Sequence, residues 1–269
     1  MKFSIVTPSF NQGRFIRDCI ESVRRQEGVE WEHIIVDACS TDETLAVLAE
    51  YPHLSWKSEP DAGQTDAINK GFRQATGEWR MWLNADDYLL PGALAAIRDF
   101  VTARPAVRVA YGESIFVAAD RSMLRRKRDH RFDFSVLLFY GCYIQSTACF
   151  FHRSIFDAGH WLDASFKVCM DYDFFVRLAD LGFVFDYLCR PLACFRWHES
   201  NVSKVFDQRR REELIKVQRG QLARSGRAWL GGNLTLRVLT EVFRCKRQCL
   251  IRVQPRQRTE VPPEEWPVR

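Results

Sequence analysis

The 269-residue sequence lacks the short motifs that mark several large enzyme classes. It has no GxGxxG and no GxxxxGK[ST] motif, which argues against a dinucleotide oxidoreductase and a P-loop NTPase. It also has no GxSxG and no HExxH motif, which argues against an α/β-hydrolase and a zinc protease. No internal repeat with a period of about 20 to 50 residues is visible, so a solenoid or a propeller is not expected.

The nine cysteines do not form the pairs that zinc ribbons and thioredoxin-type sites need. Their number is odd, no CxxC spacing occurs, and most of them lie in apolar runs. We therefore expect free thiols in a reducing compartment, the cytoplasm. The N-terminus has no long apolar segment and no small-residue cleavage site, so a signal peptide is not expected.

The longest uncharged run is a poor candidate for a membrane span. Residues 134–151 carry no charge, but they include Ser135, Gly141, Gln145, Ser146 and Thr147. These polar residues favour a buried core segment over a bilayer-spanning helix. An interfacial segment is the alternative, because the basic run 125–128 lies just upstream.

Strand and helix patterns alternate through the first 100 residues, which indicates an α/β fold with a mixed, mostly parallel central sheet. We expect strands at 2–7, 33–37, 54–58 and 79–83, and helices at 14–26, 43–50, 64–76 and from 91 to about 101. Further along we expect strands near 107–117, 146–151, 183–187 and 191–197, and a helix at 171–181. Ligands bind beyond the carboxyl ends of parallel strands, so the polar residues there should meet at one crevice.

An acidic loop is the most informative of these polar clusters. Asn84, Ala85, Asp86 and Asp87 directly follow a buried strand. Two adjacent carboxylates in such a place are costly unless a cation meets them. A divalent ion that bridges to phosphate oxygens would suit them, and capping of the next helix is the structural alternative.

Four further positions each allow a chemical and a structural interpretation. Asp37 could accept hydrogen bonds from a base or a ribose, or it could stabilise a turn. Lys70 could meet a phosphate, or it could form an exposed ion pair with Asp66 four residues earlier. Asp171 could act as a general base or cap its helix. His198 could bind a metal or phosphate, or it could be a packed histidine.

In their order and spacing, these pieces resemble the inverting glycosyltransferases of family 2, which have the GT-A fold, of the type found in bacterial polysaccharide biosynthesis. The resemblance is carried by TPSFNQ, VDACSTDET, EPDAGQTDAINKGFRQATGEW, WLNADDYLLPGAL, IQSTACFFHR, MDYDFFVRL and FRWHESNVS, all within residues 1–203. It implies a metal-dependent, inverting transfer of a sugar from a nucleoside-diphosphate sugar to an acceptor hydroxyl. The acceptor would be a saccharide or a lipid-linked glycan.

The resemblance also implies a role for each matching residue. The donor would be bound by Thr7, Pro8, Ser9, Asp37, Asp66, Lys70, Asn84, Ala85 and Asp86. Asp86 and His198 would hold a divalent metal, Mg²⁺ or Mn²⁺. Asp171 would deprotonate the acceptor hydroxyl. Asp87 would support the loop or face the sugar, and Gln145 would lie near the acceptor or the donor sugar.

Several residues depart from the family pattern. Asn84 stands at the first acidic position of the DxD motif, Met170 stands where a Glu is usual, and Ser146 where Pro is frequent. Ala38 and Cys39 stand where a pair of glycines is usual. A positive φ at either of these two residues would be strained.

The C-terminal region differs in charge from the rest of the chain. Residues 204–258 hold fifteen Lys or Arg against four Asp or Glu, a net charge of +11, whereas the whole chain has +5 and the remainder therefore −6. We expect a catalytic domain over 1–203, a basic amphipathic helical extension over 204–258 and a loose tail over 259–269. The extension would either hold the enzyme on the anionic inner face of the membrane or pack on the catalytic domain.

Two other classes of protein remain as alternatives at this point. A nucleotidyltransferase that forms sugar nucleotides would also have an α/β nucleotide fold, but its Gly-rich phosphate loop is poorly matched by residues 10–13. A non-catalytic binding module with a basic tail is the second alternative. The tail contains no recognisable nucleic-acid motif, so we expect no nucleic-acid partner.

Overall fold

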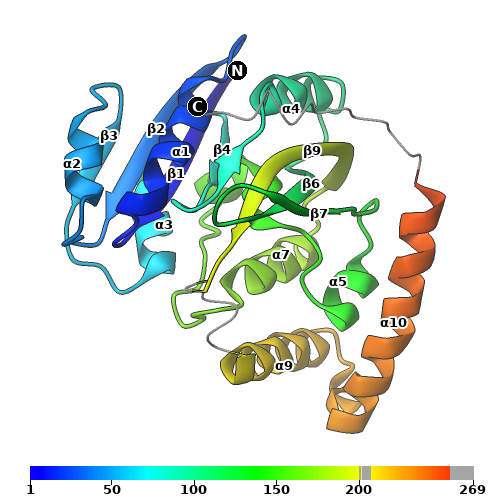
Figure 1. The fold of residues 1–269 in the computed structure, drawn as a ribbon. Coiled ribbons are helices and arrows are strands. Elements are labelled where there is room, and N and C mark those ends of the chain that lie inside the picture. Colours follow the sequence, from blue (N-terminus) through cyan, green and yellow to red (C-terminus); the bar gives the residue numbers. More distant parts are fainter. Residues whose placement is uncertain (200, 202–206, 255–269) are drawn as a thin grey trace.

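A mixed sheet of nine strands forms the centre of the molecule, with helices on both faces (Figure 1). The computed structural model describes residues 1–199, 201 and 207–254. The first half of the sheet contains β1 (Lys2–Ser9), β2 (Glu30–Asp37), β3 (Ser55–Ser58) and β4 (Trp79–Trp82). These strands pair in parallel in the order β3-β2-β1-β4. Their carboxyl ends therefore lie along one edge of the sheet, as the alternating pattern predicted.

The second half of the sheet is mainly antiparallel. It contains β5 (Tyr88–Leu89), β6 (Val109–Ala118), β7 (Met123–Lys127), β8 (Cys149–His152) and β9 (Phe185–Trp197). Only β6 and β9 pair in parallel there. A short turn joins β6 to β7, and such a turn can connect only antiparallel neighbours. The predicted mixed sheet is confirmed, and its parallel character is concentrated in the first hundred residues.

Helices cover the sheet on two faces, and the two largest apolar clusters lie between them and the sheet. They are α1 (Gly13–Arg24), α2 (Thr44–Ala49), α3 (Gln64–Gln74), α4 (Ala93–Thr102), α5 (Phe134–Tyr140), α6 (Ser154–Asp157) and α7 (Met170–Asp180), with short 3₁₀ turns at Ser146–Ala148 and Ala228–Gly231. Helices α1 and α4 pack on one face, and α3, α5 and α7 pack on the other. Helix α3 lies very close to β1. The glycine at position 71 permits this approach, because a Cβ atom there would overlap the side chain of Val6.

The uncharged run 134–151 is part of the core, as predicted. It forms α5, one 3₁₀ turn and β8, and residues 148–151 are fully buried. The strand expected at 146–151 begins only at Cys149, and the two strands expected at 183–187 and 191–197 form one long strand, β9. Sequence periodicity did not reveal β5, β7, α5 and α6, because elements this short contain too few residues for a period to show.

The basic C-terminal region is helical in the part that the structure describes. Helix α9 (Asp207–Arg224) packs on α7, and α10 (Asn233–Val253) runs along α5 (Figure 1). Leu222 and Leu236 are buried in these contacts. The expected tail over 259–269 lies outside the described residues. Among residues 1–199, 201 and 207–254, no helix combines the length and the apolar character that crossing a bilayer requires.

Candidate active site

The loop after β4 meets the end of β9 at the edge of the sheet. His198 Nε2 lies 2.9 Å from Asp86 Oδ2, although the two residues are 112 positions apart in the chain. The imidazole ring also packs against Phe15, with 4.9 Å between the ring centroids. Both side chains retain some exposure, so a ligand can reach the carboxylate and the imidazole together. The structure thus brings together the two residues that the sequence proposed as metal ligands.

The neighbouring carboxylate, Asp87, is only 1% exposed and faces inward. It accepts hydrogen bonds from the Thr147 hydroxyl at 2.7 Å, the Arg196 backbone N–H at 2.9 Å and the Asn84 amide at 3.2 Å. Burial, together with the nearby charge of Asp86, raises the pKa of Asp87 well above its usual value. These contacts fit the first of the two roles expected for Asp87, support of the loop.

A buried arginine that the sequence analysis did not single out fixes this loop. Arg196 is 2% exposed and donates to Asp18 at 2.6 Å, to the Asp86 backbone carbonyl at 2.8 Å and to the Ala119 carbonyl at 2.9 Å. A buried charge requires such partners. One signal was available, because Asp18 lies three residues after Phe15 on the apolar face of the predicted first helix.

Asn201 is a second residue that the sequence analysis missed. Its side-chain oxygen accepts from the His198 backbone N–H at 2.6 Å, and its amide donates to the Arg196 carbonyl at 3.1 Å. The same amide lies 3.5 Å from Asp86 Oδ2. Asn201 therefore fixes the backbone that carries His198. It belongs to the FRWHESNVS segment, so its position was visible although its role was not.

Asp171 lies in the first turn of α7. Its carboxylate accepts from the Tyr172 N–H at 2.7 Å and lies 3.7 Å from Cys142 Sγ. Burial raises the pKa of Asp171 to about 6, against the smaller opposing effects of these two hydrogen bonds and of Lys127. A carboxylate with this pKa is mostly ionised at neutral pH and is still basic enough to accept a proton.

The first turn of α3 links Asp171 to the acidic loop. The Gln64 amide donates to Asn84 Oδ1 at 2.8 Å. The next residue, Thr65, donates its hydroxyl to the sulfur of Met170 at 2.9 Å. Because Met170 directly precedes Asp171, the loop after β4 and the start of α7 adjoin the same helix end.

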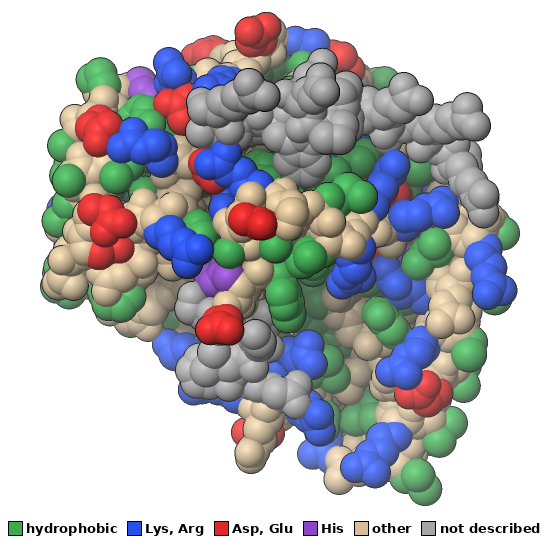
Figure 2. Space-filling view, in the orientation of Figure 1, with side chains coloured by type: hydrophobic (Ala, Val, Ile, Leu, Met, Phe, Trp, Pro, Cys, Tyr) green, Lys and Arg blue, Asp and Glu red, His purple; other side chains and the backbone are tan. Residues whose placement is uncertain are grey.

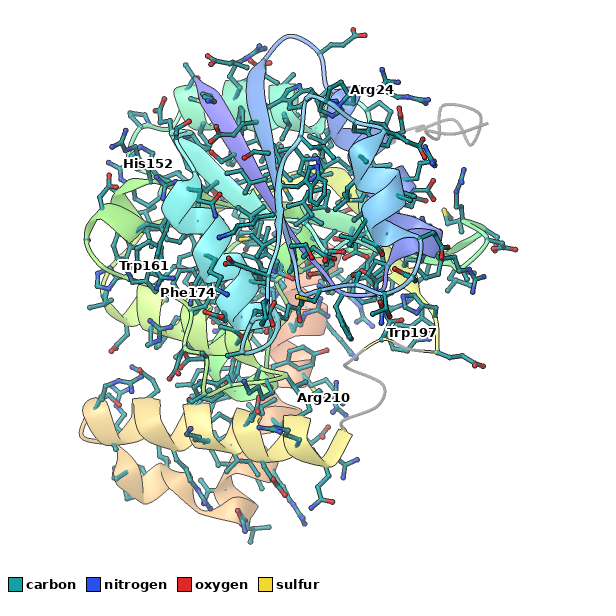
Figure 3. All side chains as sticks on the ribbon, turned by 90° about the vertical axis from the view of Figure 1, so that its left-hand side faces the viewer. Arg24, His152, Trp161, Phe174, Trp197 and Arg210 are labelled. Carbon is teal, nitrogen blue, oxygen red and sulfur yellow. The ribbon has the colours of Figure 1, made fainter. Side chains whose placement is uncertain are left out.

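Figure 3 shows Trp197, next to His198 at the end of β9, on the same side of the molecule as Arg210 on α9.

The ends of β1 and β2 contribute a second polar group. Ser9 pairs with Asp37 in the parallel register, and Pro8 precedes it in β1. Asp37 is fully buried and accepts from the Ser40 N–H at 2.9 Å, the Ser40 hydroxyl at 2.5 Å and the Ser58 hydroxyl at 2.7 Å. Among the described residues, the buried Ser9 hydroxyl has no hydrogen-bond partner. The Ser9 hydroxyl is therefore an unsatisfied polar group beneath the surface at the end of β1.

Thr7 and Ala85 are buried in the interior. The Thr7 hydroxyl shares a hydrogen bond of 2.9 Å with His33 Nε2. Burial lowers the pKa of His33 to about 3, so this histidine is neutral. Ala85 packs in an apolar cluster with Ile16 and Ile20. Neither residue is exposed to a ligand in this structure, since Thr7 is 0% and Ala85 2% exposed.

Three other expected site residues do not contact the acidic loop. Lys70 pairs with Asp66 at 3.3 Å and with Glu59 at 3.5 Å, which matches the structural alternative considered for this pair. The carbonyl of Gln145 accepts from the Ala148 N–H at 3.0 Å. Gln145 lies two residues before Thr147, so it stands close to the Asp87 network without joining it.

The residues Asp86 and His198 fit a divalent cation in part. A carboxylate oxygen and an imidazole nitrogen are ligands that Mn²⁺ accepts, and Mg²⁺ commonly takes one or two carboxylates together with phosphate oxygens and water. Within the described ranges, no three His, Cys, Asp or Glu side chains gather in a way that could hold an ion by themselves. A cation held by Asp86 and His198 would take its remaining ligands from other groups, and the phosphate oxygens of a substrate would suit it.

The turn after β2 contains Ala38 and Cys39 at the positions where the family usually has two glycines, and its backbone conformation reflects this difference. Cys39 has a φ of 59°, so a residue with a side chain occupies the left-handed region in the turn after β2. The positive φ considered for this turn is present at Cys39, where a side chain makes this conformation unfavourable.

Comparisons with known proteins identify the family of the chain and the relatives of its fold. The family model described as "Glycosyl transferase family 2" matches residues 4–159. A relative from Mycobacterium bovis, described as a PGL/p-HBAD biosynthesis glycosyltransferase, is 31% identical over 181 residues, which cover 65% of this chain and 68% of the relative.

Two solved structures resemble the fold at low sequence identity. The crystal structure of S. aureus TarS 1–349 in complex with UDP-GlcNAc has a TM-score of 0.67 and 18% identity, and the match covers 90% of this chain and 71% of that one. A mannosyltransferase from Pyrobaculum calidifontis in complex with GDP-Man and Mn²⁺ has a TM-score of 0.60 and 17% identity, with 94% and 76% coverage. The expected GT-A fold is confirmed by these neighbours. With the family model matching more than half of its length, the chain belongs to glycosyl transferase family 2 and is a transferase enzyme.

Proposed function

We propose that this enzyme transfers a sugar from a nucleoside-diphosphate sugar to an acceptor hydroxyl, with inversion at the anomeric carbon and with the help of a divalent metal. One observation carries the proposal. The Asp86–His198 pair and the carboxylate of Asp171 adjoin the same end of α3, so a cation held by the pair and a proton acceptor would act close together.

The donor nucleotide would lie over the ends of β1 and β2. Ser9 and Asp37 stand at these strand ends, and the Ser9 hydroxyl has no hydrogen-bond partner among the described residues. Both side chains are buried, so a base or a ribose would reach them only if their surroundings open. The complexes of the two structural neighbours with UDP-GlcNAc and GDP-Man support a nucleotide-sugar donor. These two donors differ in base and in sugar, so the proposal names the class of donor only.

The diphosphate would lie at the Asp86–His198 pair. A divalent cation bound there would offset the negative charge that develops on the leaving nucleoside diphosphate. Arg196 and Asn201 keep Asp86 and His198 in position from behind. Asp87, through its contact with Thr147, fixes the loop against the rest of the sheet.

Asp171 would act on the acceptor. Its carboxylate accepts the proton of the attacking hydroxyl while the oxygen forms a bond to the anomeric carbon and the diphosphate leaves from the opposite face. A single displacement of this kind inverts the configuration. Asp171 then returns the proton to solvent, and no covalent sugar–enzyme intermediate forms.

Donor binding is the first test. We expect a metal-dependent rise in melting temperature with one of the UDP-, GDP- or dTDP-sugars, followed by release of the nucleoside diphosphate. The rise should be lost in Asp86→Ala, because the carboxylate that faces His198 is gone. The control is Asp99→Ala, an exposed carboxylate on α4. A folded protein that responds to none of these sugars would contradict the proposal.

The extension, beginning near residue 204, would hold the enzyme at the inner face of an anionic membrane. Leu234, Val238 and Val242 follow at i+4 spacing and are each more than half exposed, so α10 presents an apolar stripe away from α5. Figure 2 shows Lys and Arg side chains along the right-hand side of the molecule, where Figure 1 places α10. Exposed apolar residues beside basic ones are typical of helices that bind an anionic bilayer surface.

Vesicle co-sedimentation tests this membrane contact. Binding to vesicles that contain phosphatidylglycerol should be lost in the double variant Val238→Glu/Val242→Glu. It should persist in Val184→Glu, which changes an exposed valine far from α10 in the chain. Failure of the wild-type protein to bind these vesicles at low salt would contradict membrane association.

A further inference from the structure

A strongly basic cleft lies between β7, the end of α5 and α10. The cavity has a volume of about 350 Å³. Its lining includes five cations, Arg125, Arg126, Lys127, Arg128 and Arg247, and no acidic residue. The first four follow one another in the chain at the end of β7, whereas Arg247 comes from α10. The C-terminal helix is therefore one wall of this cleft.

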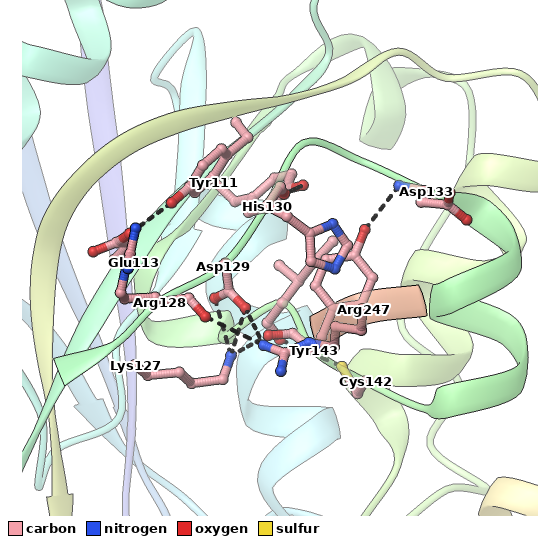
Figure 4. A network of polar contacts seen from close by, with 12 residues as sticks. Tyr111, Glu113, Lys127, Arg128, Asp129, His130, Asp133, Cys142, Tyr143 and Arg247 are labelled. Carbon is pink, nitrogen blue, oxygen red and sulfur yellow. Dashed lines mark hydrogen bonds and ion pairs between the residues drawn. The ribbon is translucent and has the colours of Figure 1, made fainter. Parts of the chain in front are cut away.

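Two buried carboxylates behind the cleft neutralise only part of this charge. Asp129 binds both Lys127, at 3.0 Å, and Arg247, at 2.8 Å (Figure 4). Glu113 binds Arg126 at 2.5 Å. Because two acids face five cations, the cleft keeps an excess of positive charge. The ion pairs to Asp129 and Glu113 also fix three of the cations in position.

Two arginines outside these ion pairs, Arg125 and Arg128, carry two of the three excess positive charges. Arg125 stacks on the ring of Phe116, with 4.2 Å from its guanidinium carbon to the ring centroid. In the described part of the chain, neither Arg125 nor Arg128 forms an ion pair with an Asp or Glu. Arg247 Nε is buried and also has no hydrogen-bond partner there. Guanidinium groups left with free donors suit the oxygens of a phosphate, which they can bind in a bidentate way.

The cleft adjoins Asp171. Cys142 lines the cavity, and its sulfur lies 3.7 Å from Asp171 Oδ2. The charge of Lys127 reaches the same carboxylate, where it lowers the pKa against the larger effect of burial. An anion bound in the cleft would thus be anchored beside the residue that accepts the proton. The donor diphosphate would bind elsewhere, at the Asp86–His198 pair. That pair lies on the loop after β4 and at the end of β9, outside the basic cleft.

We propose that this cleft binds a phosphate group of the acceptor and so positions the acceptor hydroxyl at Asp171. The inference rests on the proposed function, because it assigns the acceptor side of the same reaction. It defines the acceptor as phosphate-bearing, either a soluble glycosyl or polyol phosphate or a lipid-linked phosphate. The rigid placement of Lys127 and Arg247 by Asp129 makes the cleft a preformed anion site.

Binding of a phosphate-bearing probe tests the proposal directly. Glucose 1-phosphate is titrated into the full-length protein by calorimetry at low ionic strength. Arg128→Glu should weaken this binding about tenfold, since it replaces an attractive charge by a repulsive one. Arg128→Gln, which keeps the size of the side chain, should weaken it less and serves if the first variant folds poorly. The matched control is Arg237→Glu, an exposed arginine on α10 outside the cleft, with affinity expected within about twofold of wild type.

Two further measurements follow. One distinguishes a lipid-linked from a soluble phosphate, and the other distinguishes failure of the cleft from failure of the proposed donor site. Phosphatidylcholine vesicles with and without a polyprenyl phosphate test the lipid-linked source, and glucose 1-phosphate tests the soluble one. Binding in either arm that Arg128→Glu reduces supports the cleft. Equal binding by wild type and Arg128→Glu, or no binding in either arm, overturns it. The thermal shift with nucleotide sugars is measured on the same proteins, so a failed donor site is recognised by loss of that shift in the wild type while phosphate binding remains.

Discussion

The two charged regions beside Asp171 differ in how their charges are balanced. In the acidic region, Asp18, Asp87 and Arg196 are buried and each makes short hydrogen bonds to protein partners. In the basic cleft, by contrast, Arg125 and Arg128 have no acidic partner among the described residues, and cations outnumber carboxylates. The buried charges of the first region are all matched by protein partners. The second region keeps cations without carboxylate partners, which an anion could bind. Under the proposed function, the donor side would depend on neutralised, hydrogen-bonded groups, and the acceptor side would depend on uncompensated positive charge.

The largest expected effect comes from Asp171, which adjoins both regions. Asp171→Asn should lower the rate of sugar transfer about 10³-fold, because an amide cannot accept the acceptor proton. Nucleoside-diphosphate release in the presence of acceptor measures the loss. The matched control is Asp173→Asn, two residues further along α7, whose carboxylate binds Arg177 at 2.7 Å. Transfer at the wild-type rate by Asp171→Asn would refute the assigned base.

The same variant should remain stable. The raised pKa of Asp171 means that its ionised form, which prevails above about pH 6, opposes folding. A neutral amide removes this cost, so the free energy of unfolding at pH 8 should equal or exceed that of the wild type. Loss of activity without loss of stability separates a chemical role from a structural one.

Arg196 tests the closed network of the acidic region. Arg196→Met leaves Asp18 without its closest partner in the interior and frees the Asp86 carbonyl. Removing one member of a buried ion pair costs about 3–5 kcal/mol of the free energy of unfolding. Urea denaturation followed by circular dichroism measures it. Arg128→Ala in the basic cleft is the comparison, and we expect a change within about 0.5 kcal/mol. Similar losses in both variants would remove the contrast between the two regions.

A third prediction concerns the pH dependence of transfer. Because Asp171 must be ionised to accept a proton and its pKa is about 6, kcat/KM should fall as the pH drops through about 6. At pH 5 it should be about tenfold below the plateau. Lys127→Met should move this midpoint to higher pH, since Lys127 stabilises the carboxylate. A midpoint that stays unchanged in Lys127→Met would show that the cleft and the base are not coupled.

The smallest effect is expected at the turn after β2. Cys39→Gly should raise the free energy of unfolding by about 0.5–1 kcal/mol, because glycine adopts a positive φ without strain. The control is Ala38→Gly, where φ is not positive and the added flexibility should destabilise. Thermal denaturation distinguishes the two. Destabilisation in both variants would mean that Cys39 is not strained.

Hydrophobic periodicity predicted the parallel strands and the helices of the first hundred residues, because it is a local property. The meeting of Asp86 with His198 was implied only by the resemblance to glycosyltransferase family 2. The sequence could not predict the contact of Arg196 with Asp18, which joins residues 178 positions apart. Nor could it show that Lys70 faces Glu59 instead of the acidic loop. The basic run 125–128 was visible, but the cleft appears only when α10 brings Arg247 opposite it. The charge of a segment can be counted from the sequence, but whether that segment lines a cleft depends on the folded structure.

The long chain separations within the acidic region also set an order of assembly during protein synthesis. Asp87 is made 60 residues before Thr147 and 109 residues before Arg196. At about 5–20 residues per second, translation leaves this carboxylate without its interior donors for several seconds. A nascent chain that stops before β9 would therefore lack the Arg196 N–H that donates to Asp87 and the His198 imidazole that faces Asp86. The loop after β4 can therefore form its final contacts only after β9, well past the middle of the chain, has been synthesised.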